Sequence, residues 1–175
     1  MLLNGIIMKR ILIFTFAILF VKLSYSQSVE ADSLSKAKIS ELEFMAGKWK
    51  GSGWMMGRDG QKSEFEQSED IQFKLDSTML LIEGLGTSQG KVVHNALALI
   101  TYDKAEDKLV FRSYLQNGQN GEFPAEITDG KLFWYPTPNV RYIVGLNESG
   151  QWYETGEFKR GENWTRFFEM TLDRE

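Results

Sequence analysis

The residues of this chain that can do chemistry are polar side chains placed among apolar ones in strand-like segments. Between residues 62 and 75, Gln67 and Glu69 occupy the same alternate positions as Phe65, Ile71 and Phe73, while the positions between them are mostly charged or polar. Because successive side chains of a strand point to opposite faces, one face here is expected to be buried and the other wet. If the apolar face points inward, an amide and a carboxylate enter a buried space, where polar groups need partners.

Further candidates for ligand binding lie in the middle of later strand-like segments. An inward arginine can hold a ligand carboxylate in a bidentate pair or neutralise a glutamate of the chain itself, and the residues leave both interpretations open. Aromatic residues beside Pro136 are expected at the mouth of an apolar cavity. The predicted ligand-binding residues are Gln67, Glu69, Arg112, Tyr114, Trp134, Arg141 and Glu154.

His94 is the only histidine of the chain. A lone histidine can shuttle protons or bind haem iron. At the beginning of a strand-like segment, however, a histidine is more often a rim or packing residue. We therefore expect no haem and no other cofactor.

The sequence lacks the residues that several kinds of catalytic site require. The chain contains no cysteine, which excludes thiol catalysis, disulfides and zinc-thiolate sites. It has no Asp-x-Asp-x-Asp-Gly motif, so we predict no metal site, and we also predict no catalytic residue. One enzyme hypothesis stays open, in which an inward glutamate, Glu69 or Glu154, has a raised pKa and transfers protons.

These residues must be positioned by a β-sheet. From Gly47 onward the apolar residues recur with a period of two, and turn signals follow about every ten to twelve residues. About ten strands are expected, ending near Leu172, after a short helix between residues 35 and 45. Since closure removes the exposed edges of such a sheet, we predict a single antiparallel up-and-down β-barrel with one N-terminal helix. Its interior is either filled by side chains or has room for one small ligand.

The first 26 residues contain a basic, an apolar and a small-residue segment in the order that is typical of a secretory signal peptide. Lys9 and Arg10 precede an uncharged apolar run over residues 11–21, and small residues stand at Ser24 and Ser26. We predict cleavage between Ser26 and Gln27, with Met8 as an alternative start of translation. A membrane anchor is the competing interpretation, but the run is about half of the roughly 20 residues that a spanning helix needs. Residues 27–40 are expected to form a flexible leader and the start of the helix, and residues 41–175 the barrel.

The net charge of the chain after signal cleavage indicates which cellular locations and binding partners to expect. Removing Lys9, Arg10 and Lys22 from the 20 basic residues leaves 17 against 24 acidic ones, a net charge of −7. An acidic surface repels phosphate backbones and anionic lipid headgroups. We therefore expect a soluble periplasmic or secreted protein that binds neither nucleic acid nor, once the signal is cleaved, a membrane.

Residues 42–53 resemble the opening of calycins, in which a Gly-x-Trp strand follows a short helix; here the motif is Gly47-Lys48-Trp49. In that superfamily the tryptophan closes one end of the barrel and an arginine of the last strand packs across it. The resemblance implies a structural pair of Trp49 and Arg166, which a cation above an indole face would stabilise.

Four segments, residues 46–53, 95–103, 152–157 and 164–172, are similar to the exported bacterial family called domain of unknown function 1579. This resemblance implies a fold and no reaction. The related nitrobindin barrels share the Gly-x-Trp opening and bind haem through a histidine late in the barrel, where this chain has none.

The leading hypothesis is a non-enzymatic, lipocalin-like barrel that binds a small apolar or amphipathic molecule in its lumen, with Arg112 or Arg141 holding any carboxylate. The alternatives are a haem-binding barrel that uses His94, an enzyme that uses an inward glutamate, and an interaction module with a filled core.

Overall fold

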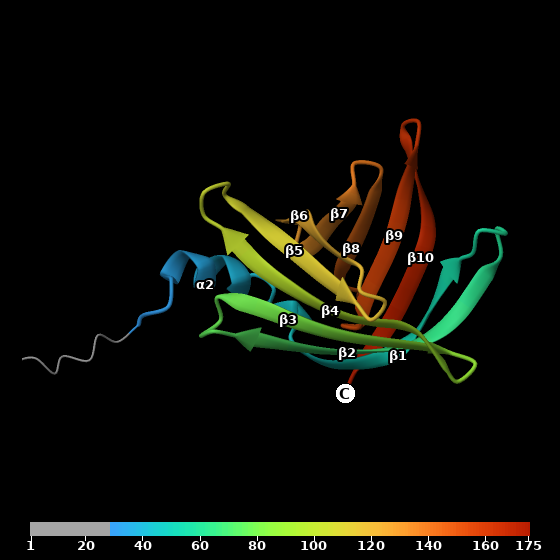
Figure 1. The fold of residues 1–175 in the computed structure, drawn as a ribbon, viewed down its shortest axis with the longest axis horizontal. Helices are drawn as coiled ribbons and strands as arrows, with labels where there is room; N and C mark the ends of the chain where they lie inside the picture. Colours follow the sequence, from blue (N-terminus) through green and yellow to red (C-terminus); the bar gives the residue numbers. More distant parts are fainter. Residues whose placement is uncertain (1–28) are drawn as a thin grey trace, which may run out of the picture. The chain divides into compact units, whose positions relative to one another are not determined.

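The computed structural model describes residues 29–175, so the predicted signal peptide lies outside the described residues. Residues 31–175 form one compact unit. Every strand in it pairs antiparallel with its neighbours in sequence, and β1 pairs with β10 to close the ring (Figure 1). The predicted fold class, an up-and-down barrel of ten strands with one short N-terminal helix, is confirmed. The strands are β1 (Gly47–Met56), β2 (Lys62–Lys74), β3 (Met79–Ser88), β4 (Lys91–Asp103), β5 (Lys108–Leu115), β6 (Asn120–Thr128), β7 (Lys131–Thr137), β8 (Val140–Leu146), β9 (Trp152–Arg160) and β10 (Asn163–Arg174).

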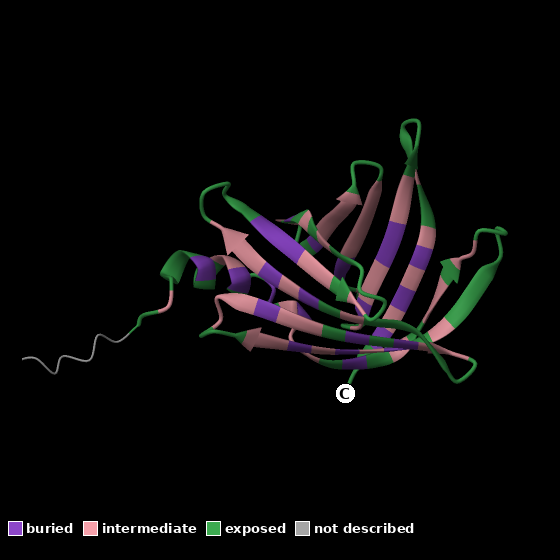
Figure 2. Ribbon diagram, viewed as in Figure 1, coloured by how far each residue is buried: buried purple, intermediate pink, exposed green. Residues whose placement is uncertain are grey.

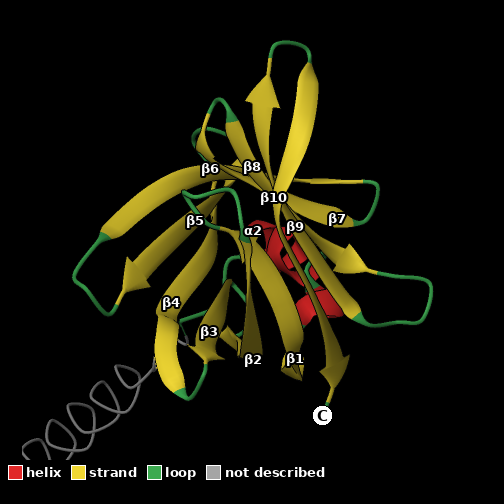
Figure 3. Ribbon diagram, turned by 90° about the vertical axis from the view of Figure 1, so that its right-hand side faces the viewer, coloured by secondary structure: helices red, strands yellow, loops and turns green. Residues whose placement is uncertain are grey.

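The helical segment has two parts, α2 (Ser33–Ser40) and η2 (Glu43–Met45). Asp32 caps α2 by accepting a hydrogen bond of 2.8 Å from the backbone N–H of Ser35. The helix therefore begins at Ser33, two residues before the expected start, because the carboxylate of Asp32 caps it. Figure 3 shows the helices, in red, through the ring of strands.

The helical segment closes one end of the barrel, which we call the base. Ile39, Leu42 and Met45 are buried in the same core as Trp49 and Trp152. The inward residues of the strand ends at the base complete this core, and the purple bands in Figure 2 mark them. The apolar faces of α2 and η2 therefore replace solvent at the base, and the loops between residues 57 and 61 and between 116 and 119 lie at the opposite end.

The tryptophan of the Gly-x-Trp motif, Trp49, has a different partner from the predicted one. Trp49 donates its Nε1–H to the carbonyl of Met45 at 2.8 Å, and the guanidinium of Arg174 lies 4.4 Å from the centre of its ring. Arg166 instead pairs with Glu169 and lies over Tyr153. The predicted pair was wrong because the strand register sets Trp49 opposite Arg174. Arg166 is eight residues away, roughly 26 Å along the strand.

Candidate functional site

A cavity of about 800 Å³ occupies the barrel above the helical segment of α2 and η2, which closes the base and which we call the helical plug. All ten strands contribute to its lining, and Met45 of η2 forms part of its floor. Lining residues far from the base, such as Val93, which is 57% exposed, form its mouth. The hypothesis of a lumen filled by side chains therefore does not hold.

One wall of the cavity is aromatic. Trp134 lies between two parallel rings, with its centre 4.4 Å from that of Phe111 and 4.5 Å from that of Tyr142. Phe123 and Phe168 extend this wall on either side. Trp134 thus lies on the cavity lining, and a stack of rings gives the wall a flat, rigid surface for an apolar ligand.

The opposite side of the cavity carries polar groups from β2. Gln67 and Glu69 are 5% and 8% exposed, and Gln67 donates from Nε2 to Glu69 Oε1 at 2.7 Å. Their pairing partners on β3 are Gly86 and Gly84. A Cβ at Gly84 would lie 2.8 Å from Glu69 Oε2, and one at Gly86 would lie 2.5 Å from Gln67 Oε1. The two glycines thus make the room in which the buried amide and carboxylate lie.

Glu69 has an unsatisfied oxygen. Within the described part of the chain, its Oε2 is the buried side-chain atom without a hydrogen-bond partner. Burial raises the pKa of Glu69 to about 7, against the opposing effect of the hydrogen bond from Gln67. Such an atom costs free energy unless a ligand, a proton or water satisfies it.

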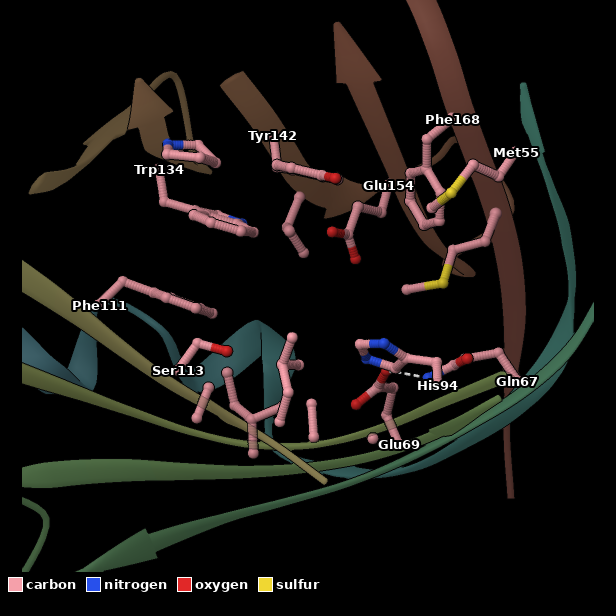
Figure 4. Close-up of a pocket in the computed structure, with 18 of the residues that line it drawn as sticks. Met55, Gln67, Glu69, His94, Phe111, Ser113, Trp134, Tyr142, Glu154 and Phe168 are labelled. Atoms are coloured by element: carbon pink, nitrogen blue, oxygen red, sulfur yellow. Dashed lines mark hydrogen bonds between the residues drawn. The ribbon is translucent and has the colours of Figure 1, made fainter. Parts of the chain in front are cut away.

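Glu154 enters the cavity from β9, on the side opposite Glu69. Figure 4 shows the two carboxyl groups pointing into the same space. Trp152 donates from Nε1 to Glu154 Oε2 at 3.3 Å. Burial, and after it the charge of Glu69, raise the pKa of Glu154 to about 8. The predicted inward orientation of both glutamates is confirmed.

Two further titratable groups face the carboxyl pair. Burial and the charge of Glu154 raise the pKa of Tyr142 to about 12, so its hydroxyl stays a donor. His94 lies near Gln67 and Glu69 in Figure 4, and its strand position is opposite Gly86. Burial lowers the pKa of His94 from its ordinary value, which favours the neutral ring.

Three predicted ligand-binding residues do not face the cavity. Arg112 donates to Glu122 at 2.8 Å, Arg141 donates to Glu157 at 2.8 and 2.7 Å, and Tyr114 is 45% exposed. Their neighbours in sequence line the cavity, so the alternation of the strands directs these three side chains outward. Arg141 also stacks on Trp164, with 4.1 Å between guanidinium and ring centre. Both arginines therefore form ion pairs with glutamates of the chain, outside the barrel and not inside it as both interpretations assumed.

The sequence reasoning missed Gly84, Gly86 and most of the aromatic wall. The motif Gly84-Leu85-Gly86 was the available signal, since two glycines at alternate positions of one strand empty one face of it. Phe111 and Tyr142 point inward because they occupy the alternate strand positions that face the interior. The short sequence segments around them do not show which of the two alternating sets of positions that is.

The fold and the cavity define a closed antiparallel β-barrel with one plugged end and a two-carboxylate lumen. No family model matches the sequence, and no curated protein matches it, so the likeness to domain of unknown function 1579 stays a prediction. Several solved structures are similar, among them the crystal structure of Rv2717c from M. tuberculosis. That similarity covers 79% of this chain and 97% of the other, at 10% identity and a TM-score of 0.57. It supports the barrel fold.

No helix among the described residues is long and apolar enough to span a membrane.

Proposed function

We propose that the protein binds a small apolar or amphipathic molecule in the lumen of its barrel. The observation that carries the proposal is the cavity of about 800 Å³, which has a mouth and a mainly apolar lining. Ligand sites in proteins are typically concave spaces of about 300–1,000 Å³ with apolar walls and a few polar groups that orient the ligand. The stack of Trp134 with Phe111 and Tyr142 supplies the wall, and Gln67, Glu69 and Glu154 supply the polar groups.

Binding can be tested with prodan, a neutral naphthalene dye whose emission shifts to shorter wavelength in apolar surroundings. Ser113 lines the cavity in the middle of β5, so Ser113→Trp fills part of the lumen and should weaken prodan binding at least tenfold. Ser68→Trp, on the outward face of β2, is the matched control and should leave the affinity unchanged. Equal affinities for the two variants would refute lumen binding.

The natural ligand can be sought in protein purified from its own host. Native mass spectrometry would show a mass excess that disappears after denaturation. Ser113→Trp should carry less of this excess than the unmodified protein.

We further propose that the protein is exported and cleaved between Ser26 and Gln27. The basic, apolar and small-residue order of the first 26 residues supports this proposal. N-terminal sequencing of material from the periplasm or culture medium would test it, and an intact N-terminus would contradict it.

A further inference from the structure

We propose that the lumen selects a ligand with a basic nitrogen, an organic ammonium ion attached to an apolar or aromatic body, and that Glu69 and Glu154 hold this cation between them. This inference rests on the proposed binding function and names the class of ligand.

The first support is the unsatisfied acceptor in the lumen. Glu69 Oε2 is buried and has no hydrogen-bond donor among the described residues, whereas Glu69 Oε1 already accepts from Gln67. An ammonium group offers two or three N–H donors and no acceptor, so one N–H can satisfy the free oxygen of Glu69 and the others stay available to Glu154, which points into the same space.

The second support is the sign of the lumen's charges. Among the described residues that line the cavity, none is Lys or Arg, while Glu69 and Glu154 point into it from opposite walls. Two carboxylates near each other repel a ligand carboxylate, and a buried charge is stable when a charge of opposite sign pairs with it. The arginines that the sequence analysis assigned to a ligand carboxylate are paired outside, with Glu122 and Glu157.

The third support is the aromatic wall. The rings of Tyr142 and Phe168 stand on either side of Glu154 in Figure 4, and ring faces attract cations. Carboxylate and aromatic groups together match a compound that has both an ammonium group and an apolar ring or chain.

An inorganic cation fits less well. No group of three or more His, Asp or Glu side chains within the described residues is arranged to hold a metal ion. A monovalent ammonium needs only the two carboxylates, and its apolar body fills the rest of the cavity.

Three naphthalene compounds with similar bodies test the inference by displacement of prodan at pH 7.5. They are 2-(1-naphthyl)ethylamine, 2-(1-naphthyl)ethanol and 1-naphthylacetate. We expect the amine to bind at least tenfold more tightly than the alcohol, and the carboxylate more weakly than both.

Conservative variants identify the groups responsible. In the double variant Glu69→Gln with Glu154→Gln, the preference for the amine over the alcohol should fall below threefold. Glu66→Gln is the matched control, because Glu66 lies on the same strand with its side chain exposed on the outer face. It should keep the full preference for the amine.

Proton release gives a second measurement on the unmodified protein, independent of how the variants fold. Neutral carboxyl groups must ionise to pair with an ammonium ion, so amine binding at pH 7 should release about one proton and alcohol binding none. Calorimetry in buffers of different ionisation enthalpy measures this number. The titratable groups that line the cavity are Glu69, His94, Tyr142 and Glu154, together with the exposed Glu64 five residues before Glu69 on β2.

The possible outcomes separate the two proposals. Equal binding of the three compounds, or a preference for the amine that survives the double variant, overturns the amine inference and leaves lumen binding intact. Failure of all three compounds and of prodan to bind overturns both.

Discussion

At the scale of single residues, burying the carboxyl groups of Glu69 and Glu154 costs free energy. Folding takes both carboxyl groups out of water, and no cation among the described residues accompanies them into the lumen. Their raised pKa values express that cost, since the neutral form is the one that a dry cavity tolerates. The inward place of Glu69 could be predicted because its strand has clear alternation. The fact that Glu154 faces it from another strand could not, because the closure of the ring brings β2 and β9 together.

The first prediction concerns the pH dependence of stability. An unfolded glutamate loses its proton near pH 4.5, whereas the folded protein keeps the protons of Glu69 and Glu154 to about pH 7 and 8. Between these limits the folded state binds more protons, so the free energy of unfolding falls as pH rises. For Glu69 alone the loss is on the order of 3 kcal/mol by pH 9.

Urea denaturation at pH 5 and pH 9 measures this effect. The double variant Glu69→Gln with Glu154→Gln should lose less stability between the two pH values than the unmodified protein, and it should be the more stable protein at pH 9. Glu66→Gln should follow the unmodified protein. Parallel pH curves for all three proteins would rule out the buried carboxyl pair as the cause.

The second prediction concerns the arginine above Trp49. Arg174 contacts the indole ring and donates from Nη1 to the carbonyl of Ala46 at 2.9 Å, so Arg174→Leu should cost about 1–2 kcal/mol. Arg166→Leu removes a surface ion pair with Glu169 and should cost less than about 1 kcal/mol. Chemical denaturation of both variants decides between the two arginines, and a larger loss for Arg166→Leu would support the pairing expected from the resemblance.

At the scale of elements, the strands were predictable and the details that interrupt them were not. Strong alternation and glycine-containing turns located ten strands to within a few residues. β7 continues through Pro136 to Thr137, with a shift in register between Trp134 and Thr137. A bulge absorbs the missing N–H of proline on that strand. The α2 segment lacked clear helical periodicity, because only two of its eight residues, Ser35 and Ile39, are buried.

The third prediction tests the helical plug. Ile39 is fully buried in the core at the base, so Ile39→Ala should lower the free energy of unfolding by about 2–5 kcal/mol. Leu34 is on the same helix but 45% exposed, and Leu34→Ala should cost at most about 0.5 kcal/mol. Similar losses in urea denaturation for the two variants would mean that α2 does not contribute to the core as a plug.

At the scale of the whole molecule, closing the sheet creates the interior and also sets its chemistry. Composition and period predicted a barrel, but an open lumen depends on the size of every inward side chain at once. The small inward residues Gly84, Ala96 and Ser113 stand where larger ones would fill the space. Their joint effect cannot be read from any one strand.

The fourth prediction separates this lumen from a haem site. Haem carries two propionates, and the described cavity lining offers them neither Lys nor Arg, while Glu69 lies beside His94. Addition of haemin should therefore give no Soret shift of the kind that histidine ligation produces. A shift that His94→Ala abolishes would restore the haem hypothesis.

The pairing of β1 with β10 brings the C-terminus to the base of the barrel, where Glu175 donates its backbone N–H to the carbonyl of Lys48 at 2.9 Å. A tag, a fusion partner or a solid support attached after Glu175 therefore projects away from the opening on the far side. Immobilised protein would keep its opening toward the solution, which suits the chain to capture experiments on mixtures of small molecules.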